Sequence, residues 1–242
     1  MKALILAAGL GTRLQPLTNS KPKALIQINS KTLLELTVTQ LLKFGFDQII
    51  VNVHHFADQI TDYLETKKNF GAQISISDES DLLLDTGGGL KKASWFFSDG
   101  KPFLIHNVDV LSDLDLTKLY ESHLGSNGIA TLAVQNRKSS RYFLFDKEKN
   151  LCGWTNVKTG ESKIVRHDSE ALEPFAFSGI QIVSPAIFDL LPDDKVFSLV
   201  DLYLSVASKN RITYFDHTNS VFVDLGKKEN LAEAVVLIDK IF

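Results

Sequence analysis

Two glycines and two cations follow the first apolar segment of the chain. Residues 3–8 form a continuous apolar run, Gly9, Gly11 and Arg13 come soon after it, and Lys23 lies ten residues beyond Arg13. A glycine-rich turn after a buried strand lets backbone N–H groups approach phosphate oxygens closely. Because Arg13 and Lys23 add positive charge at the same place, the segment predicts a phosphate-binding loop, and a triphosphate is its natural ligand.

Two common nucleotide-binding motifs do not match this loop. The dinucleotide-binding fingerprint places a third glycine where the chain has Leu14, and an acidic residue about twenty positions further on, where it has Asn29. The P-loop ends in Gly-Lys-Ser/Thr, and no such triplet follows the turn. These departures argue against a dinucleotide-dependent oxidoreductase.

Two aspartates stand where strands are expected to end. Asp109 follows the apolar run 103–106, and Asp224 lies between the last expected strand and the last expected helix. Each could be an ordinary helix cap or Asx turn. A strand-end carboxylate can instead hold a hard cation, and Mg²⁺ needs few protein ligands when substrate phosphates complete its shell. Two carboxylates that arrive from distant parts of the chain make a better metal site than either one alone.

Three consecutive glycines, residues 87–89, precede a helix that we expect at residues 90–97. Glycine destabilises a helix start because it loses more backbone entropy than any other residue. We therefore expect something flat to lie against this backbone, with a plain flexible loop as the alternative.

The elements that position these residues alternate in type as far as residue 135. We expect strands at 3–8, 46–53, 74–76, 103–106 and 129–135, and helices at 33–44, 58–67, 90–97 and 114–123. Thr32 and Glu35 have the spacing of a capping box, and Gly45 is a stop signal. The alternation predicts an α/β fold with a Rossmann-like, mostly parallel sheet, helices on both faces, and ligands beyond the carboxyl ends of the strands.

The chain changes texture from residue 141 to residue 182. Short β-like pieces at 142–145, 151–156 and 162–166 are separated by turns rich in Lys, Asn and Gly, which predicts a small antiparallel β insertion on the sheet. Strands at 175–183, 212–215 and 221–223, and helices from 185, at 199–209 and at 228–241, complete the pattern. No linker divides the chain, so we expect one domain over residues 1–242.

The composition excludes several classes of protein. The 242 residues are 44% hydrophobic and 23% charged with a net charge of −3, so there is no basic footprint for nucleic acid. No apolar run approaches the ~18 residues of a membrane span, and the first residues do not form a signal peptide, so we expect a cytoplasmic protein. The single cysteine, Cys152, excludes an internal disulfide and is expected to be buried. We expect a monomer or a small homo-oligomer.

Residues 6–23 resemble the signature loop of the sugar-1-phosphate nucleotidyltransferases, and the resemblance covers nearly the whole chain, most weakly between 136 and 174. It implies that a nucleoside triphosphate and a sugar 1-phosphate react to give a nucleotide-sugar and pyrophosphate. It also implies that residues 1–135 form a nucleotide-binding half and residues 136–242 a sugar-binding half. The nucleotide contacts that it implies are Ala8, Gly9, Gly11, Thr12, Arg13, Lys23, Gly87 and Gly88, the last two against the base.

The resemblance also assigns the chemistry. Arg13, Lys23 and Asp109 would be catalytic, and Asp109 and Asp224 would bind Mg²⁺. The sugar phosphate would be bound by Asn107, Ser178 and Gly179.

The substrates stay open at this level. The short length and the Thr-Gly-Gly-Gly run favour UTP with an N-acetylated, muramate-like sugar 1-phosphate of cell-wall recycling, with guanylyl transfer to mannose or heptose 1-phosphate as the alternative. Ser198 stands where a muramate-type enzyme is expected to have a basic residue. A non-catalytic sensor of nucleotides or sugar phosphates is the alternative from another class, although Arg13, Lys23 and both aspartates are retained.

Overall fold

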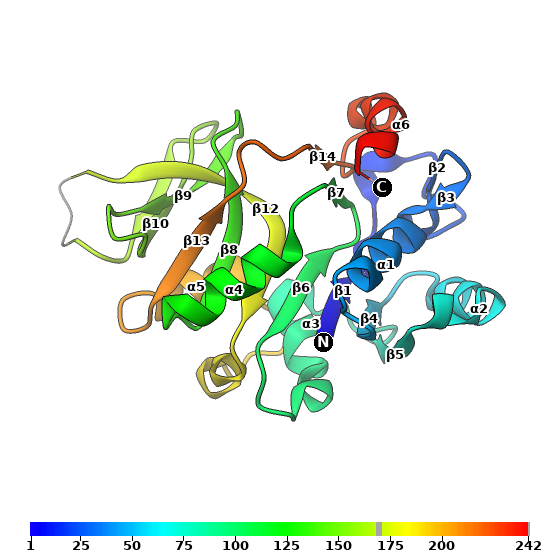
Figure 1. Ribbon diagram of the computed structural model, residues 1–242, viewed down its shortest axis with the longest axis horizontal. Coiled ribbons are helices and arrows are strands. Elements are labelled where there is room, and N and C mark those ends of the chain that lie inside the picture. Colours follow the sequence, from blue (N-terminus) through cyan, green and yellow to red (C-terminus); the bar gives the residue numbers. More distant parts are fainter. Residues whose placement is uncertain (168–170, 242) are drawn as a thin grey trace.

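The computed structural model describes residues 1–167 and 171–241. A 10-stranded sheet runs through it, in the order β11-β10-β9-β12-β6-β1-β4-β5, with β8 beside β12 and β13 beside β8 (Figure 1). Its strands are β1 (Lys2–Leu6), β4 (Gln48–Val53), β5 (Gln73–Asp78), β6 (Phe103–Asn107), β8 (Ala130–Gln135), β9 (Arg141–Phe145), β10 (Leu151–Asn156), β11 (Glu161–Ile164), β12 (Glu173–Val183) and β13 (Ile212–Asp216).

The first half of the chain forms a parallel sheet, as predicted. Strands β5, β4, β1 and β6 pair in parallel, and β13 is parallel to β8. Strand β12 is antiparallel to both β6 and β8, so it joins the two parallel groups. The sheet is therefore mixed but mostly parallel, and β9, β10 and β11 extend it as the expected small antiparallel insertion.

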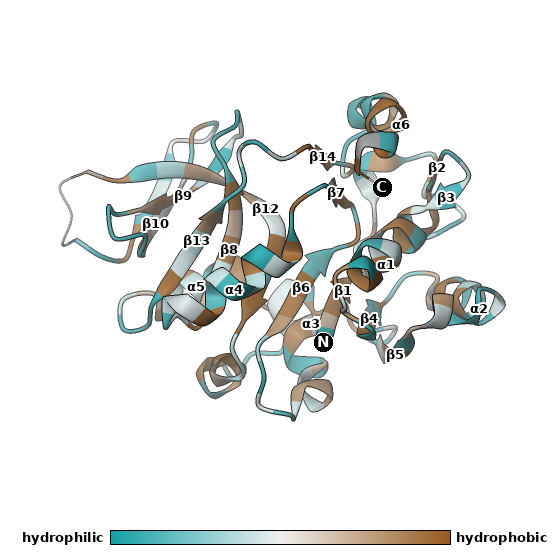
Figure 2. Ribbon diagram, viewed as in Figure 1, coloured by the Kyte–Doolittle hydropathy of each residue, from teal (hydrophilic) through white to brown (hydrophobic). Residues whose placement is uncertain are grey.

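Helices cover both faces of the sheet because its strands are apolar on both sides. One cluster of buried side chains joins the sheet to α1 (Leu33–Lys43), α2 (Ala57–Thr66), α4 (Leu116–Ser126) and α6 (Glu229–Ile241). A second cluster, on the other face, joins it to α3 (Asp85–Lys92) and α5 (Leu199–Val206). Figure 2 shows apolar residues concentrated along the central strands and hydrophilic stretches on α2 and α4.

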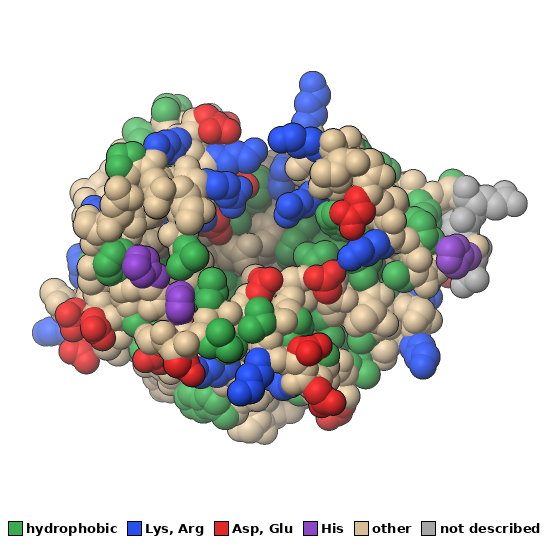
Figure 3. Space-filling view, turned by 180° about the vertical axis from the view of Figure 1, so that it is seen from behind, with side chains coloured by type: hydrophobic (Ala, Val, Ile, Leu, Met, Phe, Trp, Pro, Cys, Tyr) green, Lys and Arg blue, Asp and Glu red, His purple; other side chains and the backbone are tan. Residues whose placement is uncertain are grey.

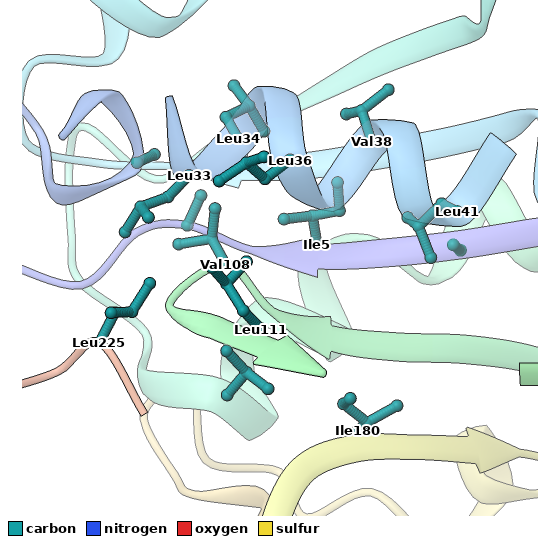
Figure 4. Packing of buried hydrophobic residues seen from close by; sticks show 14 of the residues in the cluster. Ile5, Leu33, Leu34, Leu36, Val38, Leu41, Val108, Leu111, Ile180 and Leu225 are labelled. Carbon is teal, nitrogen blue, oxygen red and sulfur yellow. The ribbon is translucent and has the colours of Figure 1, made fainter. Parts of the chain in front are cut away.

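The first helix shows how the sequence sets these contacts. Thr32 caps α1 by accepting a hydrogen bond of 3.0 Å from the backbone N–H of Glu35, as the capping-box spacing predicts. In Figure 4, Ile5 projects from β1 toward α1, where Leu36 and Leu41 lie beside it. Ile5 and these two leucines are fully buried, so this contact holds α1 against β1 in the sheet.

Short elements complete the fold. Strands β2 (Gln27–Ile28) and β3 (Lys31–Thr32) form a hairpin, and β14 (Phe222–Asp224) pairs with β7 (Val110–Ser112). The amide of Asn29 in the hairpin donates to the carbonyl of Val235 in α6, 3.3 Å away. Turns of 3₁₀ helix lie at Thr12–Leu14, Lys23–Leu25, Lys68–Gly71, Ser94–Phe97 and Pro185–Leu190.

The predicted helix at 90–97 was placed wrongly. Helix α3 begins at Asp85 and ends at Lys92, and a separate 3₁₀ turn follows. The three glycines at 87–89 therefore lie inside a helix, and tertiary contacts outweigh their low helix propensity.

Cys152 is buried, as expected, with its thiol near Asp146, and burial raises the pKa of the Cys152 thiol to about 11. Among the described residues, we find no helix with the length and apolar character that a membrane crossing requires.

Candidate active site

A cleft of about 560 Å³ opens beyond the carboxyl ends of β1, β4 and β6. Residues 6–13 and 107–109 supply much of its wall. The remaining wall residues are Lys23, Asn52, Leu83, Asp85, Thr86, Val196 and Gly226. Figure 3 shows a hollow in one face of the molecule, with Lys and Arg side chains gathered around its upper rim.

The loop after β1 presents free backbone donors to this cleft. Within the described part of the chain, the N–H groups of residues 9–13 donate no hydrogen bond. Gly11 has a φ of +65°, and Thr18 holds the loop by donating to the carbonyl of Gly11 at 2.9 Å. A run of unpaired N–H groups in a fixed loop is a good receptor for phosphate oxygens.

The side chain of Asn52 supports this loop from below. Its Oδ1 accepts hydrogen bonds from the N–H groups of Ala7 at 2.6 Å and Ala8 at 3.3 Å. Its Nδ2 donates to Oε1 of Glu79 at 2.8 Å. Glu79 is fully buried, and burial raises the pKa of its carboxyl group. We did not identify either residue from sequence, although an Asn in the apolar run 49–53, near a strand's carboxyl end, was a usable signal.

Lys23 and Asp109 form an ion pair in the wall of the cleft. The ammonium group of Lys23 contacts Oδ2 of Asp109, and the Lys23 residue is 8% exposed. Lys23 starts a 3₁₀ turn after Pro22, while Asp109 follows β6. The predicted phosphate-binding loop and the predicted strand-end aspartate therefore meet in space.

The second aspartate reaches the first because β14 pairs with β7. Asp224 is opposite Val110, and the N–H of Leu225 donates to the carbonyl of Asp109 at 2.8 Å. A Cβ atom on Gly226 would lie 2.8 Å from Oδ1 of Asp224, 2.9 Å from Nη2 of Arg13 and 3.2 Å from Oδ2 of Asp109. The guanidinium group and both carboxylates therefore converge on Gly226.

The two carboxylates fit one kind of metal site. The described residues contain no group of three or more His, Cys, Asp or Glu side chains arranged to hold a metal ion. Mg²⁺ commonly takes one or two carboxylates and completes its shell with water and substrate phosphates. Asp109 and Asp224, beside the free N–H groups of residues 9–13, have the chemistry of such a site and not of an all-protein cage.

Asn107 and Gly179, both predicted to bind the sugar phosphate, lie next to each other. Asn107 lines the cleft, and a Cβ atom on Gly179 would lie 2.7 Å from Nδ2 of Asn107. Gly179 has a φ of +72° at an irregularity in the pairing of β12 with β8. Its lack of a side chain therefore accommodates Asn107, and Gly179 is not part of the cleft wall itself.

The expected direct contact of Ser178 with a sugar phosphate is not supported by its position. Ser178 is buried, and its hydroxyl forms a hydrogen bond of 2.8 Å with Nε2 of His217. Burial lowers the pKa of His217 to about 4. The hydroxyl therefore connects β12 to the segment after β13 and does not line the cleft.

Gly87 and Gly88 also differ from their expected role. A Cβ atom on Gly87 would lie 2.4 Å from the ring of Phe197, and one on Gly88 would lie 2.2 Å from the carbonyl oxygen of Lys195. The N–H of Gly87 donates to the Phe197 carbonyl at 2.9 Å. These glycines let the segment 195–197 pack on α3, and their neighbours Asp85 and Thr86 line the cleft in their place.

The mostly parallel sheet, the loop of free N–H groups and the paired aspartates define an α/β protein with a cleft suited to phosphate groups at the carboxyl ends of its strands. The family model for nucleotidyl transferases matches residues 2–151. The chain belongs to this family of transferases of phosphorus-containing groups.

Named relatives agree with this assignment, and a solved structure shares the fold. The chain is 33% identical to a UTP–glucose-1-phosphate uridylyltransferase from Synechocystis sp., over 97% of this chain and 62% of that protein. It is 30% identical to an N-acetylmuramate α-1-phosphate uridylyltransferase from Neisseria meningitidis, over 98% of each chain. The fold matches that of HddC from Yersinia pseudotuberculosis with a TM-score of 0.79 at 22% identity, over 98% of this chain and 99% of that one.

Proposed function

We propose that this protein joins a nucleoside triphosphate to a sugar 1-phosphate, giving a nucleotide-sugar and pyrophosphate. The observation that carries the proposal is the convergence of Arg13, Asp109 and Asp224 around Gly226, next to the free N–H groups of residues 9–13. A phosphate receptor in the cleft wall and two carboxylates that meet at Gly226 suit a reaction between two anionic substrates.

In the proposed reaction, a phosphate oxygen of the sugar 1-phosphate attacks the α-phosphorus of the triphosphate in line. A new P–O bond forms, the bond from the α-phosphorus to the bridging oxygen breaks, and pyrophosphate leaves with that electron pair. The N–H groups of residues 9–13 bind the triphosphate, and Ala8 adds backbone to the same wall. Positioning and charge neutralisation supply most of the catalysis, because no side-chain nucleophile is needed.

The charged side chains divide this work. Arg13 stabilises the negative charge that grows on the leaving pyrophosphate, and Lys23 holds the α-phosphate from beside Asp109. Asp109 and Asp224 would hold Mg²⁺, which would supply positive charge to neutralise the phosphate groups. Asn107, which is fixed against Gly179, faces the same cleft and contacts the acceptor.

Uridylyl transfer to an N-acetylated, muramate-like sugar 1-phosphate is the favoured specific reaction. The Neisseria relative, which matches nearly end to end, carries that name. Such a reaction would take place in the cytoplasm, where nucleoside triphosphates are available, and would serve cell-wall recycling. Guanylyl transfer to mannose 1-phosphate is the second candidate, because a Dictyostelium discoideum relative at 27% identity is a mannose-1-phosphate guanylyltransferase subunit.

A grid of the four ribonucleoside triphosphates against several sugar 1-phosphates, read by pyrophosphate release, tests the proposal. We expect pyrophosphate only when both substrates are present, with the fastest release from UTP. Faster release from GTP would favour the second candidate. Triphosphate binding without pyrophosphate release from any pair would indicate a sensor and contradict the proposed reaction.

A further inference from the structure

Arg137, just beyond the end of β8, is a partly buried cation that forms no ion pair with any described residue. Its Nη2 donates to the carbonyl of Phe177 at 3.0 Å, and its guanidinium carbon lies 4.4 Å from the ring centroid of Phe222. Its Nε is buried without an acceptor, and no carboxylate of the described residues forms an ion pair with it. Burial lowers the pKa of Arg137, and the nearby charge of Asp224 acts in the opposite direction.

The neighbours of Arg137 lie in segments that lead to the cleft, although Arg137, Phe177 and Phe222 are not among the residues that line it. Phe222 lies two residues before Asp224 on β14, and Phe177 lies two residues before Gly179, which packs on Asn107. Arg137 is therefore anchored to both segments that carry the predicted acceptor and metal residues. Two cations lie near the carboxylate of Asp224. Arg13 reaches it from the loop after β1, and Arg137, beyond the end of β8, is within electrostatic range.

The cations that line the cleft are both proposed to serve the triphosphate, which leaves the phosphate of the second substrate without one. These cations, Arg13 and Lys23, both come from the first part of the chain, and Lys23 already contacts Asp109. If both serve the triphosphate, the dianionic phosphate of the second substrate has no cation of its own. The Nε of Arg137 is closed to ligands, but a guanidinium group that an aromatic ring and a carbonyl hold in place can still offer its outer Nη donors to phosphate oxygens.

We propose that Arg137 binds the phosphate group of the acceptor substrate and is a binding residue for the proposed reaction. This inference rests on the proposed function, since it takes a sugar 1-phosphate as the acceptor. The competing explanation is structural: Arg137 would only clamp β12 to β14 through Phe177 and Phe222. The two explanations predict different kinetic effects.

The test compares Arg137→Met, Arg137→Lys and the matched control Lys138→Gln, which removes a charge from the exposed neighbouring side chain. We expect Arg137→Met to raise the KM for the sugar 1-phosphate by about ten- to a hundredfold, the usual effect of losing a charge-assisted hydrogen bond. The KM for the triphosphate should change by less than about threefold, because residues that do not contact each other couple only weakly. Arg137→Lys should recover part of the loss, and Lys138→Gln should behave as wild type.

Three outcomes would overturn the proposal. An unchanged acceptor KM in Arg137→Met would exclude phosphate binding, and equal losses for both substrates with a lower unfolding midpoint would favour the structural clamp. A loss confined to acceptors that carry a carboxylate, when N-acetylmuramate 1-phosphate is compared with N-acetylglucosamine 1-phosphate, would assign Arg137 to the sugar and not to the phosphate. A wild-type enzyme that releases no pyrophosphate from any pair would instead contradict the proposed function, which separates the two failures.

Discussion

Asn52 and Glu79 form a buried hydrogen bond of 2.8 Å that connects two walls of the cleft. On one side, Asn52 accepts from the N–H groups of Ala7 and Ala8 in the first loop. On the other side, Glu79 accepts from the N–H of Leu84, directly before α3, at 3.2 Å. The loop that is proposed to hold the triphosphate and the helix that begins at Asp85 are thus tied to one pair of side chains.

We expect Asn52→Ala to lower kcat/KM for the triphosphate by about tenfold or more, because the loop is no longer held in register. It should also lower the free energy of unfolding by about 1–3 kcal/mol, because two backbone donors and a carboxylate lose a partner. Steady-state kinetics and urea unfolding measure the two effects. The control is Asn150→Ala, which removes a buried amide that bonds to Asp146 away from the cleft, and should affect stability alone. Equal kinetic losses in both variants would show that Asn52 acts only through stability.

The second prediction concerns the paired carboxylates. Asp109→Asn and Asp224→Asn should each lower turnover on the order of a hundredfold or more and raise the Mg²⁺ concentration needed for half-maximal rate. A chelator should abolish the wild-type activity, and added Mg²⁺ should restore it.

Asp113→Asn is the matched control for these variants. Asp113 lies just past β7 and accepts a hydrogen bond from the N–H of Val221 at 2.8 Å, outside the cleft wall. It should keep nearly wild-type Mg²⁺ dependence. If either carboxylate variant also kept it, the assignment of that aspartate to the metal would be wrong.

The third prediction uses Gly226, around which Arg13, Asp109 and Asp224 converge. Gly226→Ala adds a methyl group within contact of all three side-chain ends, which are flexible and can move apart without disturbing the backbone. We expect kcat to fall by about tenfold or more while the melting temperature stays within about 2 °C of wild type. Gly125→Ala in α4, where a Cβ meets nothing within 4 Å, is the control. Unchanged kcat in Gly226→Ala would show that the three side chains do not act as one site.

The fourth prediction separates base binding from helix packing at Gly88. A Cβ atom here would meet the carbonyl of Lys195 at 2.2 Å, so the backbone of one segment must move. Gly88→Ala should lower the free energy of unfolding by about 1–3 kcal/mol or more. It should reduce activity with every triphosphate by a similar factor, since Asp85 and Thr86 shift with the helix. Selective loss with the preferred triphosphate alone would support direct contact with the base.

The starts of α1 and α3 show which parts of the fold can be predicted from sequence and which cannot. The capping residue Thr32 fixed the start of α1, because the signal and its effect lie within four residues. The start of α3 could not be found in this way, because its glycines are placed by contacts with residues 195–197, more than a hundred positions away. Local propensity predicts an element only when no distant contact outweighs it.

The site shows the same division. The loop after β1 and Asp109 could be singled out because each follows directly from an apolar strand. Asp224 was assigned to the metal through the family resemblance, because an aspartate before the last helix is by itself typical of a cap or a turn. The position of Ser178 could not be predicted because side chains alternate between the faces of a strand, and the irregularity around Gly179 changes which face each residue takes. Asn52 and Glu79 were missed because their roles depend on β4 lying between β1 and β5, which is a property of the sheet and not of either segment.

The last prediction concerns stability against acid. His123 in α4 is 3% exposed and bonds to the hydroxyl groups of Thr131 at 3.0 Å and Ser184 at 2.8 Å. Burial disfavours its charged form and lowers the pKa of His123 to about 4, from an ordinary value of 6.5. The unfolded chain therefore binds a proton between these pH values that the folded chain does not. The contribution of His123 to the free energy of unfolding is therefore complete above pH 6.5 and is lost as the pH falls toward 4.

For His123 alone, this linkage amounts to about 2 kcal/mol between pH 7 and pH 5. His106 and His217, whose pKa values burial also lowers to about 4, add to the slope of the wild-type curve. His123→Gln keeps a side chain that can bond to both hydroxyls but cannot take up a proton. Urea unfolding at a series of pH values should give a shallower loss of stability in this variant, whatever its stability at pH 7. Parallel curves for the two proteins would mean that His123 is charged in the folded state or becomes hydrated as the pH falls.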